Sequence, residues 1–118
     1  MHRLSFAAVG LALVASAGSP HPNVSIGRDG TVVVQTFQFT PKALEVPAGT
    51  RVVWTNGDEI EHMVTAGVPD SAQGEFSGTL ASKGTTFSRT FTRPGTYPYY
   101  CARHQFMRGV IRVTSTGE

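Results

Sequence analysis

Three side chains that can bind a soft metal lie close together near the end of the chain. Cys101, His104 and Met107 form the pattern C-x-x-H-x-x-M within the segment YPYYCARHQFMRGVIRV. They supply a thiolate, an imidazole and a thioether, a combination that favours copper or another soft transition metal. Cys101 is the only cysteine of the chain, so it has no internal disulfide partner. The pattern therefore predicts a metal site between two strands.

A fourth donor must come from elsewhere in the chain, and elimination favours His62. Leaving aside the N-terminal segment, the chain has three histidines, and His21 lies in a stretch with little to pack. His62 stands at the mouth of a predicted strand, and a sandwich can bring it to the same end as Cys101. Two imidazoles and a thiolate in a trigonal arrangement, with a weak axial thioether, form the blue-copper electron-transfer set. We therefore predict one copper ion bound by His62, Cys101, His104 and Met107.

Two other chemistries can use a cysteine and histidines. A cysteine nucleophile activated by a histidine would leave Met107 without a role, and the sequence offers no third group to orient the histidine. Zinc could bind Cys101 and two histidines, but zinc sites seldom include a thioether. Taken singly, each residue has an ordinary structural role, as a buried cysteine, a surface histidine or a core methionine. Together they predict a metal-binding carrier rather than an enzyme.

The N-terminus has the pattern of a cleavable export signal. A short basic start and the apolar run Leu4 to Val14 precede Ala15-Ser16-Ala17, which supplies the small residues that a signal peptidase needs. Cleavage would remove residues 1–17 and leave 18–30 as a flexible leader before a domain at 31–118. The apolar run is shorter than the roughly 20 residues of a membrane span. We expect a periplasmic or extracellular protein without stable membrane insertion.

Short strands separated by proline and glycine turns dominate the predicted domain. The expected strands are Thr31–Phe39, Ala43–Val46, Thr50–Thr55, His62–Thr65, Thr85–Phe91, Tyr97–Cys101 and Val110–Thr114. The polar, glycine-rich segment Ala66 to Lys83 is expected to be a long loop with one short turn of helix. Because no helical period is evident, the pattern predicts an all-β protein, an antiparallel β-sandwich with one modest core.

The charge of the chain excludes one class of partner. The formal net charge is +2, and it falls to +1 if Arg3 leaves with the signal. Basic residues are scattered along the sequence, whereas nucleic-acid-binding proteins gather them into patches. We therefore expect no nucleic-acid partner.

The chain resembles the cupredoxins, the family of small type-1 copper proteins, and is most similar to their plastocyanin and amicyanin branch. The segments FTPKALEVPAGTRVVWTNGDEIEH and GTTFSRTFTRPGTYPYYCARHQFM carry the resemblance, which runs from about Thr31 to Thr114. The two-residue gap between His104 and Met107 is like that of amicyanin. The resemblance implies a Greek-key sandwich and copper bound by the four residues named above, with both imidazoles binding through Nδ1. Met63 and Arg103 depart from the residues that are common beside the two histidines.

The resemblance also implies a function. Such a protein would carry single electrons between redox partner proteins by cycling copper between Cu(II) and Cu(I), as a monomer that docks its partners transiently near His104. Phe106 and Pro69 are candidates for an apolar docking patch. The acidic loop Asp58 to Glu61 and the basic Arg103 and Arg108 could steer a partner of either sign.

Two alternatives to electron transfer remain at the level of sequence. A copper-binding protein could deliver or buffer the metal without redox exchange, although a dedicated Cu(I) carrier would use more methionines than Met63 and Met107. A secreted sandwich that binds other molecules without a metal would leave Cys101 unexplained.

Overall fold

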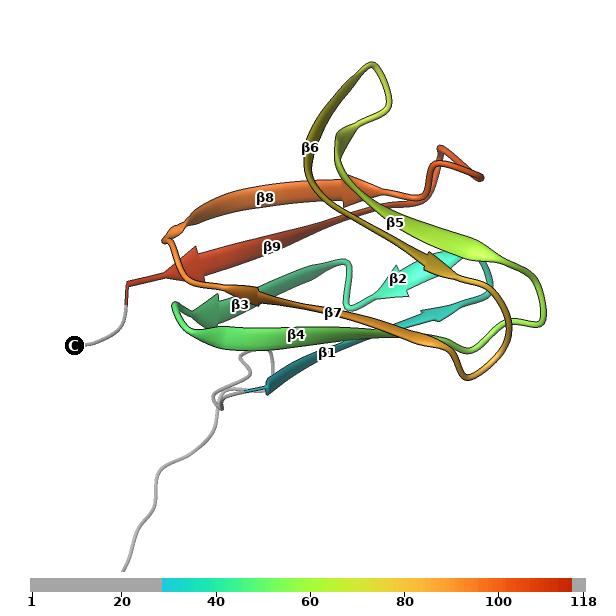
Figure 1. Ribbon diagram of the computed structural model, residues 1–118, viewed down its shortest axis with the longest axis horizontal. Helices are drawn as coiled ribbons and strands as arrows, with labels where there is room; N and C mark the ends of the chain where they lie inside the picture. The colour runs from blue at the N-terminus through green and yellow to red at the C-terminus, as the bar shows by residue number, and fades with distance from the viewer. Residues whose placement is uncertain (1–28, 116–118) are drawn as a thin grey trace, which may run out of the picture.

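The computed structural model describes residues 29–115, which form two packed β-sheets (Figure 1). Sheet 1 has four strands in the order β2-β1-β4-β7, and sheet 2 has five in the order β3-β9-β8-β5-β6. The strands are β1 (Asp29–Gln35), β2 (Gln38–Thr40), β3 (Ala43–Pro47), β4 (Thr50–Asn56), β5 (His62–Val68), β6 (Ser71–Leu80), β7 (Thr86–Phe91), β8 (Gly95–Tyr100) and β9 (Arg108–Thr114). Among the described residues there is no helix that could cross a membrane. The predicted signal peptide and most of the predicted leader lie outside these residues.

The predicted all-β sandwich is confirmed, but its sheets are mixed rather than purely antiparallel. β1 runs parallel to β4, with Val32 beside Trp54, and β3 runs parallel to β9, with Leu44 beside Ile111. The chain passes between the sheets at the β2–β3, β3–β4, β4–β5, β6–β7 and β7–β8 connections. These crossings bring strands of the same direction together, whereas the hairpins β1–β2, β5–β6 and β8–β9 pair antiparallel.

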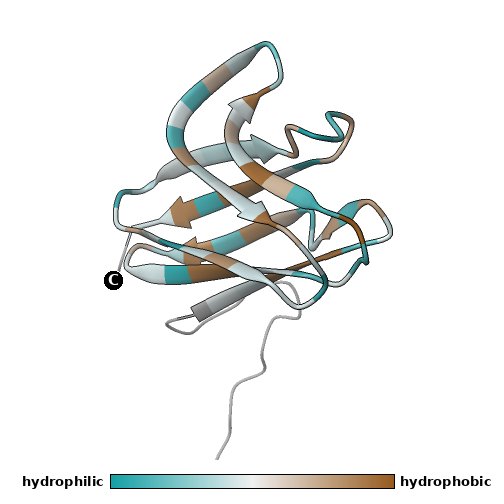
Figure 2. Ribbon diagram, turned by 45° about the vertical axis from the view of Figure 1, so that its right-hand side comes forward, coloured by the Kyte–Doolittle hydropathy of each residue, from teal (hydrophilic) through white to brown (hydrophobic). Residues whose placement is uncertain are grey.

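Alternating burial along the strands builds the core between the sheets. In β4, Val52 and Trp54 are buried and Arg51 is exposed, as expected for a strand with one face in a core. The same alternation of hydrophobic and hydrophilic colour can be followed along the strands in Figure 2. Trp54 lies at the centre, with its ring centroid 5.4 Å from that of Tyr99 and 5.5 Å from that of Phe87. This packed aromatic core fixes the two sheets relative to each other.

The N-terminal strand is shorter than predicted and turns back on itself. β1 begins at Asp29, two residues before the expected start, and ends at Gln35 instead of Phe39. Thr36 and Phe37 then form a two-residue turn with φ of 54° and 59°, and β2 returns antiparallel. Sequence patterns miss such a turn because both left-handed positions usually hold Asn or Gly. Here the carboxylate of Asp58 accepts hydrogen bonds from the N–H groups of both residues.

The loop predicted over Ala66 to Lys83 is wrong, because most of it is a β-hairpin. β5 continues to Val68 and β6 covers Ser71–Leu80, so the two strands project beyond the rest of the sandwich (Figure 1). The first half of β6 is exposed on both faces, which explains why it lacks the apolar alternation of a half-buried strand. Gly78 follows in β6, where a Cβ atom would lie 2.2 Å from the Phe87 ring. Polar and glycine residues are thus compatible with strand structure here.

Candidate metal centre

The structure brings His62, Cys101 and His104 together at one end of the sandwich. Their potential ligand atoms all lie within 4.8 Å of one another. His62 begins β5, whereas Cys101 follows the end of β8. β5 and β8 are antiparallel neighbours, with Thr65 beside Tyr100, so the start of one meets the end of the other. Strand pairing in sheet 2 therefore places His62 beside Cys101.

The loop between β8 and β9, which we call the C-H-M loop (residues 101–107), folds as two consecutive turns. The N–H of His104 donates to the carbonyl of Cys101 at 3.2 Å, and the N–H of Met107 donates to the carbonyl of His104 at 2.9 Å. The N–H of Cys101 then donates back to the carbonyl of Met107 at 3.1 Å. Met107 is only 2% exposed and packs in the same core cluster as Cys101. Each turn spans three residues, which is also the spacing between Cys101, His104 and Met107. The side chains of Cys101 and Met107 are both buried.

His62 is oriented by a carboxylate on one side of its ring. Its Nε2 lies 2.8 Å from Oδ2 of Asp58. An imidazole beside a carboxylate keeps its proton on the nitrogen that faces the carboxylate, which leaves the other nitrogen with a free lone pair. That other nitrogen, Nδ1, is buried and has no hydrogen-bond partner in the protein. A buried, unpartnered lone pair in a cluster of donors fits a metal ion.

Asp58 is held in place by more than His62. Its Oδ1 accepts a hydrogen bond from the N–H of Thr36 at 2.8 Å, and its Oδ2 accepts one from the N–H of Phe37 at 3.2 Å. Burial alone would raise the pKa of Asp58, but the hydrogen bonds from Thr36, His62 and Phe37 outweigh it and hold the pKa below its usual value. Asp58 is therefore an inward-facing anion.

The loop that carries Asp58 is shaped by Asn56, which is 1% exposed. Its side-chain amide donates to the carbonyls of Ile60 and Leu80 at 2.9 and 3.1 Å, and its Oδ1 accepts from the N–H of Asp58 at 2.8 Å. Every polar atom of this buried amide thus holds part of the chain around the centre. Asn56 supports the loop and does not reach the donor cluster.

Cys101 is fully buried, and its sulfur lies among polar groups that suit a thiolate. The backbone N–H of Met63 donates to Sγ at 3.3 Å, and Nδ1 of His104 lies 3.8 Å from Sγ. Metal–ligand bonds, taking those of zinc as a guide, are about 2.0 Å to nitrogen and 2.3 Å to sulfur. A nitrogen and a sulfur that bound one metal at an angle of 120° would then be about 3.7 Å apart. The observed separation therefore fits one shared metal. Met63 supplies its backbone, so its unusual side chain leaves this contact intact.

Aromatic rings cover the cluster on the side of the β1–β2 hairpin. The ring of Phe37 meets His62 and His104 edge-on, with centroid distances of 5.5 and 5.2 Å. Trp54 and Tyr99 belong to the core cluster that contains Cys101. Phe106, a candidate for the docking patch, is 71% exposed.

Sequence reasoning missed the contributions of Phe37 and Asp58. The Phe37 contact depends on the unpredicted turn at residues 36–37. For Asp58, the spacing of four residues before His62 was the available signal. Pro69 does not lie beside the centre, because it follows the end of β5 that is opposite His62, about 20 Å along the strand.

Comparison with known proteins identifies the family. A family model described as copper binding proteins of the plastocyanin/azurin family matches residues 24–114. The chain belongs to this family. As a cupredoxin with a cluster of two histidines and a cysteine, it takes a single type-1 copper ion as its cofactor.

Individual cupredoxins agree with this assignment. Amicyanin from Paracoccus denitrificans is 37% identical over 89 residues, covering 72% of this chain and 66% of that relative, which is just under two thirds of its length. Plastocyanin from Scenedesmus fuscus is 32% identical over 98 residues, covering 76% of this chain and 96% of that protein. The structure of a purple cupredoxin from Nitrosopumilus maritimus superposes with a TM-score of 0.67 at 26% identity, covering 72% and 99% of the two chains.

Proposed function

We propose that this cupredoxin carries single electrons between redox partner proteins, with copper bound by Nδ1 of His62, Sγ of Cys101, Nδ1 of His104 and the thioether of Met107. The observation that carries the proposal is the donor cluster, in which three ligand atoms lie within 4.8 Å. Copper supplies the one-electron couple, since thiolate and thioether favour Cu(I) and imidazole suits both oxidation states. The chain contributes a donor set held by sheet 2 and by the turns of the C-H-M loop.

The rigidity of the donors supports electron transfer over metal delivery. Cys101 and His62 are fully buried, and His62 is fixed by the carboxylate of Asp58. Donors that hardly move when the charge of the metal changes keep the reorganisation small, which speeds electron exchange. Delivery would instead require the donors to open. If His62, Cys101, His104 and Met107 all bound the metal, they would leave no open position for a substrate, whereas catalytic metal sites keep one.

Electrons would enter and leave through His104. It is the half-buried member of the cluster, and its ring contacts the rings of Phe37 and Phe106, which are 40% and 71% exposed. Exposed apolar groups of this kind mark sites where another protein docks. We propose that a monomer meets its partners here, in small and short-lived contacts.

The experiment that tests the proposal begins with the addition of Cu(II) to the purified protein. We expect an intense visible charge-transfer band that bleaches on reduction and returns on oxidation, and that is absent from Cys101→Ser and His62→Ala. Met107→Leu should keep the band but shift the reduction potential, whereas Met63→Leu serves as the control with little change. Tight binding of Cu(I) without colour would favour copper delivery, and retained colour in Cys101→Ser would refute the site.

The N-terminal pattern supports export as part of the proposal. If residues 1–17 are a signal peptide, the mature chain recovered from the cell envelope or the medium should begin at Gly18. Mass spectrometry of its N-terminal peptide tests this. An intact N-terminus on the exported protein would contradict it.

A further inference from the structure

A groove of about 440 Å³ lies beside the metal centre, between the β1–β2 hairpin and the C-H-M loop. Its lining residues are Thr36, Phe37, Gln38, Phe39, Lys42, Phe106, Met107 and Arg108. Of the four predicted copper ligands only Met107 lies in its wall. The groove therefore adjoins the patch around His104 and shares Phe37 and Phe106 with it.

The groove has apolar walls. Phe39 and Met107 are 3% and 2% exposed, so they form its floor, whereas the exposed rings of Phe37 and Phe106 form its sides. These two rings are tilted by 31° with centroids 6.2 Å apart. Each of the two rings also contacts the ring of His104. A side chain that entered the groove would thus lie next to both Met107 and the half-buried His104.

The rim of the groove is positively charged. Lys42 and Arg108 are exposed, and within residues 29–115 neither makes an ion pair, Arg108 being bonded only to the carbonyl of Gln105 at 3.3 Å. The two lie on neighbouring segments, because the carbonyl of Lys42 accepts a hydrogen bond from the N–H of Val110 at 2.9 Å. None of the lining residues is acidic.

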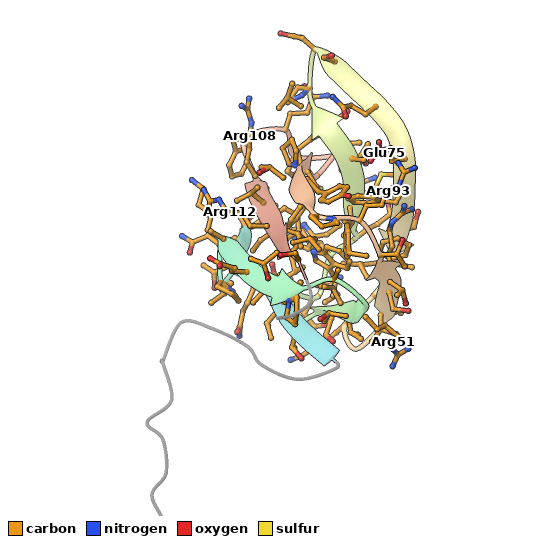
Figure 3. The ribbon with its side chains drawn as sticks, turned by 90° about the vertical axis from the view of Figure 1, so that its left-hand side faces the viewer. Arg51, Glu75, Arg93, Arg108 and Arg112 are labelled. Atoms are coloured by element: carbon orange, nitrogen blue, oxygen red, sulfur yellow. The ribbon has the colours of Figure 1, made fainter. Side chains whose placement is uncertain are left out.

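The nearby carboxylates do not neutralise this rim. Asp58 faces inward to His62 and the turn, Glu61 pairs with Arg103 at 3.0 Å, and Glu59 lies 3.7 Å from Lys83. Figure 3 shows Arg108 on one side of the molecule and Arg93 with Glu75 on the other. The cations of the groove therefore act on one face, beside the proposed exit for electrons.

We propose that this groove receives an acidic surface of the redox partner, with carboxylates against Lys42 and Arg108 and an apolar side chain packed against the exposed rings of Phe37 and Phe106. The inference rests on the proposed function and adds the sign and shape of the partner. Two cations are too few for binding to nucleic acid or to an anionic membrane, which use larger basic clusters. They are enough to steer a negatively charged protein toward a short-lived contact.

The rates of electron transfer to two small oxidants of opposite charge test whether the potential at the groove is positive. The copper-loaded, reduced protein is mixed with ferricyanide, an anion, or with tris(phenanthroline)cobalt(III), a cation. One electron passes from Cu(I) to Fe(III) or Co(III), giving Cu(II) and Fe(II) or Co(II). At low salt we expect Lys42→Glu and Arg108→Glu each to slow ferricyanide several-fold and to speed the cobalt complex. The effects should fade at high salt, where screening shortens the Debye length to about 3 Å at 1 M.

Arg93→Glu is the matched control, because it changes the net charge equally on the turn before β8, at the opposite end of that strand from Cys101. It should leave both rates nearly unchanged. Equal effects of the three variants would overturn the inference, since they would report only net charge. If the unaltered protein exchanged electrons with neither oxidant, the proposed function itself would fail.

The shape of the groove needs a second measurement. We expect the peptide Glu-Glu-Phe-Glu-Glu to shift the amide NMR signals of residues 36–39 and 106–109, and the peptide Lys-Lys-Phe-Lys-Lys to leave them in place. Phe37→Ala should weaken the response to the acidic peptide while the visible band persists. Shifts with both peptides, or with neither, would contradict an acidic occupant of the groove.

Discussion

The two ring nitrogens of His62 have separate tasks. Nε2 contacts the carboxylate of Asp58 at 2.8 Å, and Nδ1 is the buried atom without a partner in the protein. The carboxylate thus selects the tautomer and the direction of the ring before any metal arrives. Because a negative charge behind the ring makes the imidazole a better donor, it stabilises Cu(II) more than Cu(I).

Asp58→Asn tests this role at the scale of one residue. The amide keeps the size of the side chain but removes the charge. Loss of such a partner typically lowers metal affinity about 10- to 100-fold. If Cu(I) affinity is unchanged, a loss confined to Cu(II) raises the reduction potential by about 60–120 mV. Protein-film voltammetry measures the shift.

Glu59→Gln is the control for Asp58→Asn, since it removes the same charge from an 82% exposed side chain in the same loop. A potential that moved equally in both variants would show that Asp58 acts through net charge alone. A visible band that disappeared in Asp58→Asn would show that it holds the site together rather than tuning it.

For single residues, the sequence predicted the properties that depend only on the type of residue. Thiolate, imidazole and thioether chemistry belongs to Cys101, His104 and Met107 wherever the chain places them. The partner of His62 depends on orientation, and the sequence allowed Asp58 to be read as an exposed steering charge. Its inward position follows from the turn at Thr36 and Phe37, whose N–H groups need an acceptor.

Among the secondary-structure elements, the paired strands β8 and β9 flank the C-H-M loop and support it. Tyr99 of β8 lies opposite Gly109 of β9. A Cβ atom on Gly109 would lie 2.4 Å from the Tyr99 ring and its hydroxyl, so only glycine lets the ring lie over β9. Burial raises the pKa of Tyr99, whose hydroxyl therefore stays protonated and neutral. The ring centroid lies 4.7 Å from that of Phe39, and this contact stabilises the strand that ends just before Cys101.

Gly109→Ala should therefore destabilise the protein by about 1–3 kcal/mol, because the added methyl group forces the Tyr99 ring to move. Urea unfolding of the copper-free protein measures the loss. Gly30→Ala adds the same methyl group against the end of the Leu44 side chain, 3.1 Å away, which can shift. It should cost less, and an equal loss in both variants would count against this explanation.

A strand could be predicted from the sequence when one of its faces is buried and the other is exposed. β4 has one buried face, so the buried Val52 and Trp54 alternate with more exposed neighbours and the period of two residues is visible in the sequence. The first half of β6 has no buried face, and its polar residues resemble a loop. Parallel pairing of β1 with β4 leaves no mark on either sequence, because it depends on the route of the chain between the sheets.

At the scale of the whole molecule, one core has to stabilise two sheets in a domain of under ninety described residues. Domains of this size bury a modest fraction of their surface, so their margin of stability is small. The metal centre joins strand β5 to the C-H-M loop. Copper bound there would stabilise the native state by mass action, because the unfolded chain does not hold the donors together.

Copper loading should consequently raise the melting temperature. At a free copper concentration about 1,000 times the dissociation constant, the gain is about 4 kcal/mol. For a domain of this size that corresponds to roughly 15–30 °C, measurable by differential scanning calorimetry. Cys101→Ala should abolish most of the rise, and a rise of the same size in that variant would place the stabilising metal elsewhere.

The carboxylate of Asp58 links events that are far apart in the sequence. It holds the N–H groups of Thr36 and Phe37 as well as the ring of His62. If the hairpin opens, the ring loses its support, and if Asp58 leaves the ring, the turn loses its acceptors. The hairpin and the metal centre should therefore undergo local unfolding as one cooperative unit. Amide hydrogen exchange at residues 36 and 37 would then slow when copper binds, although neither amide touches the metal.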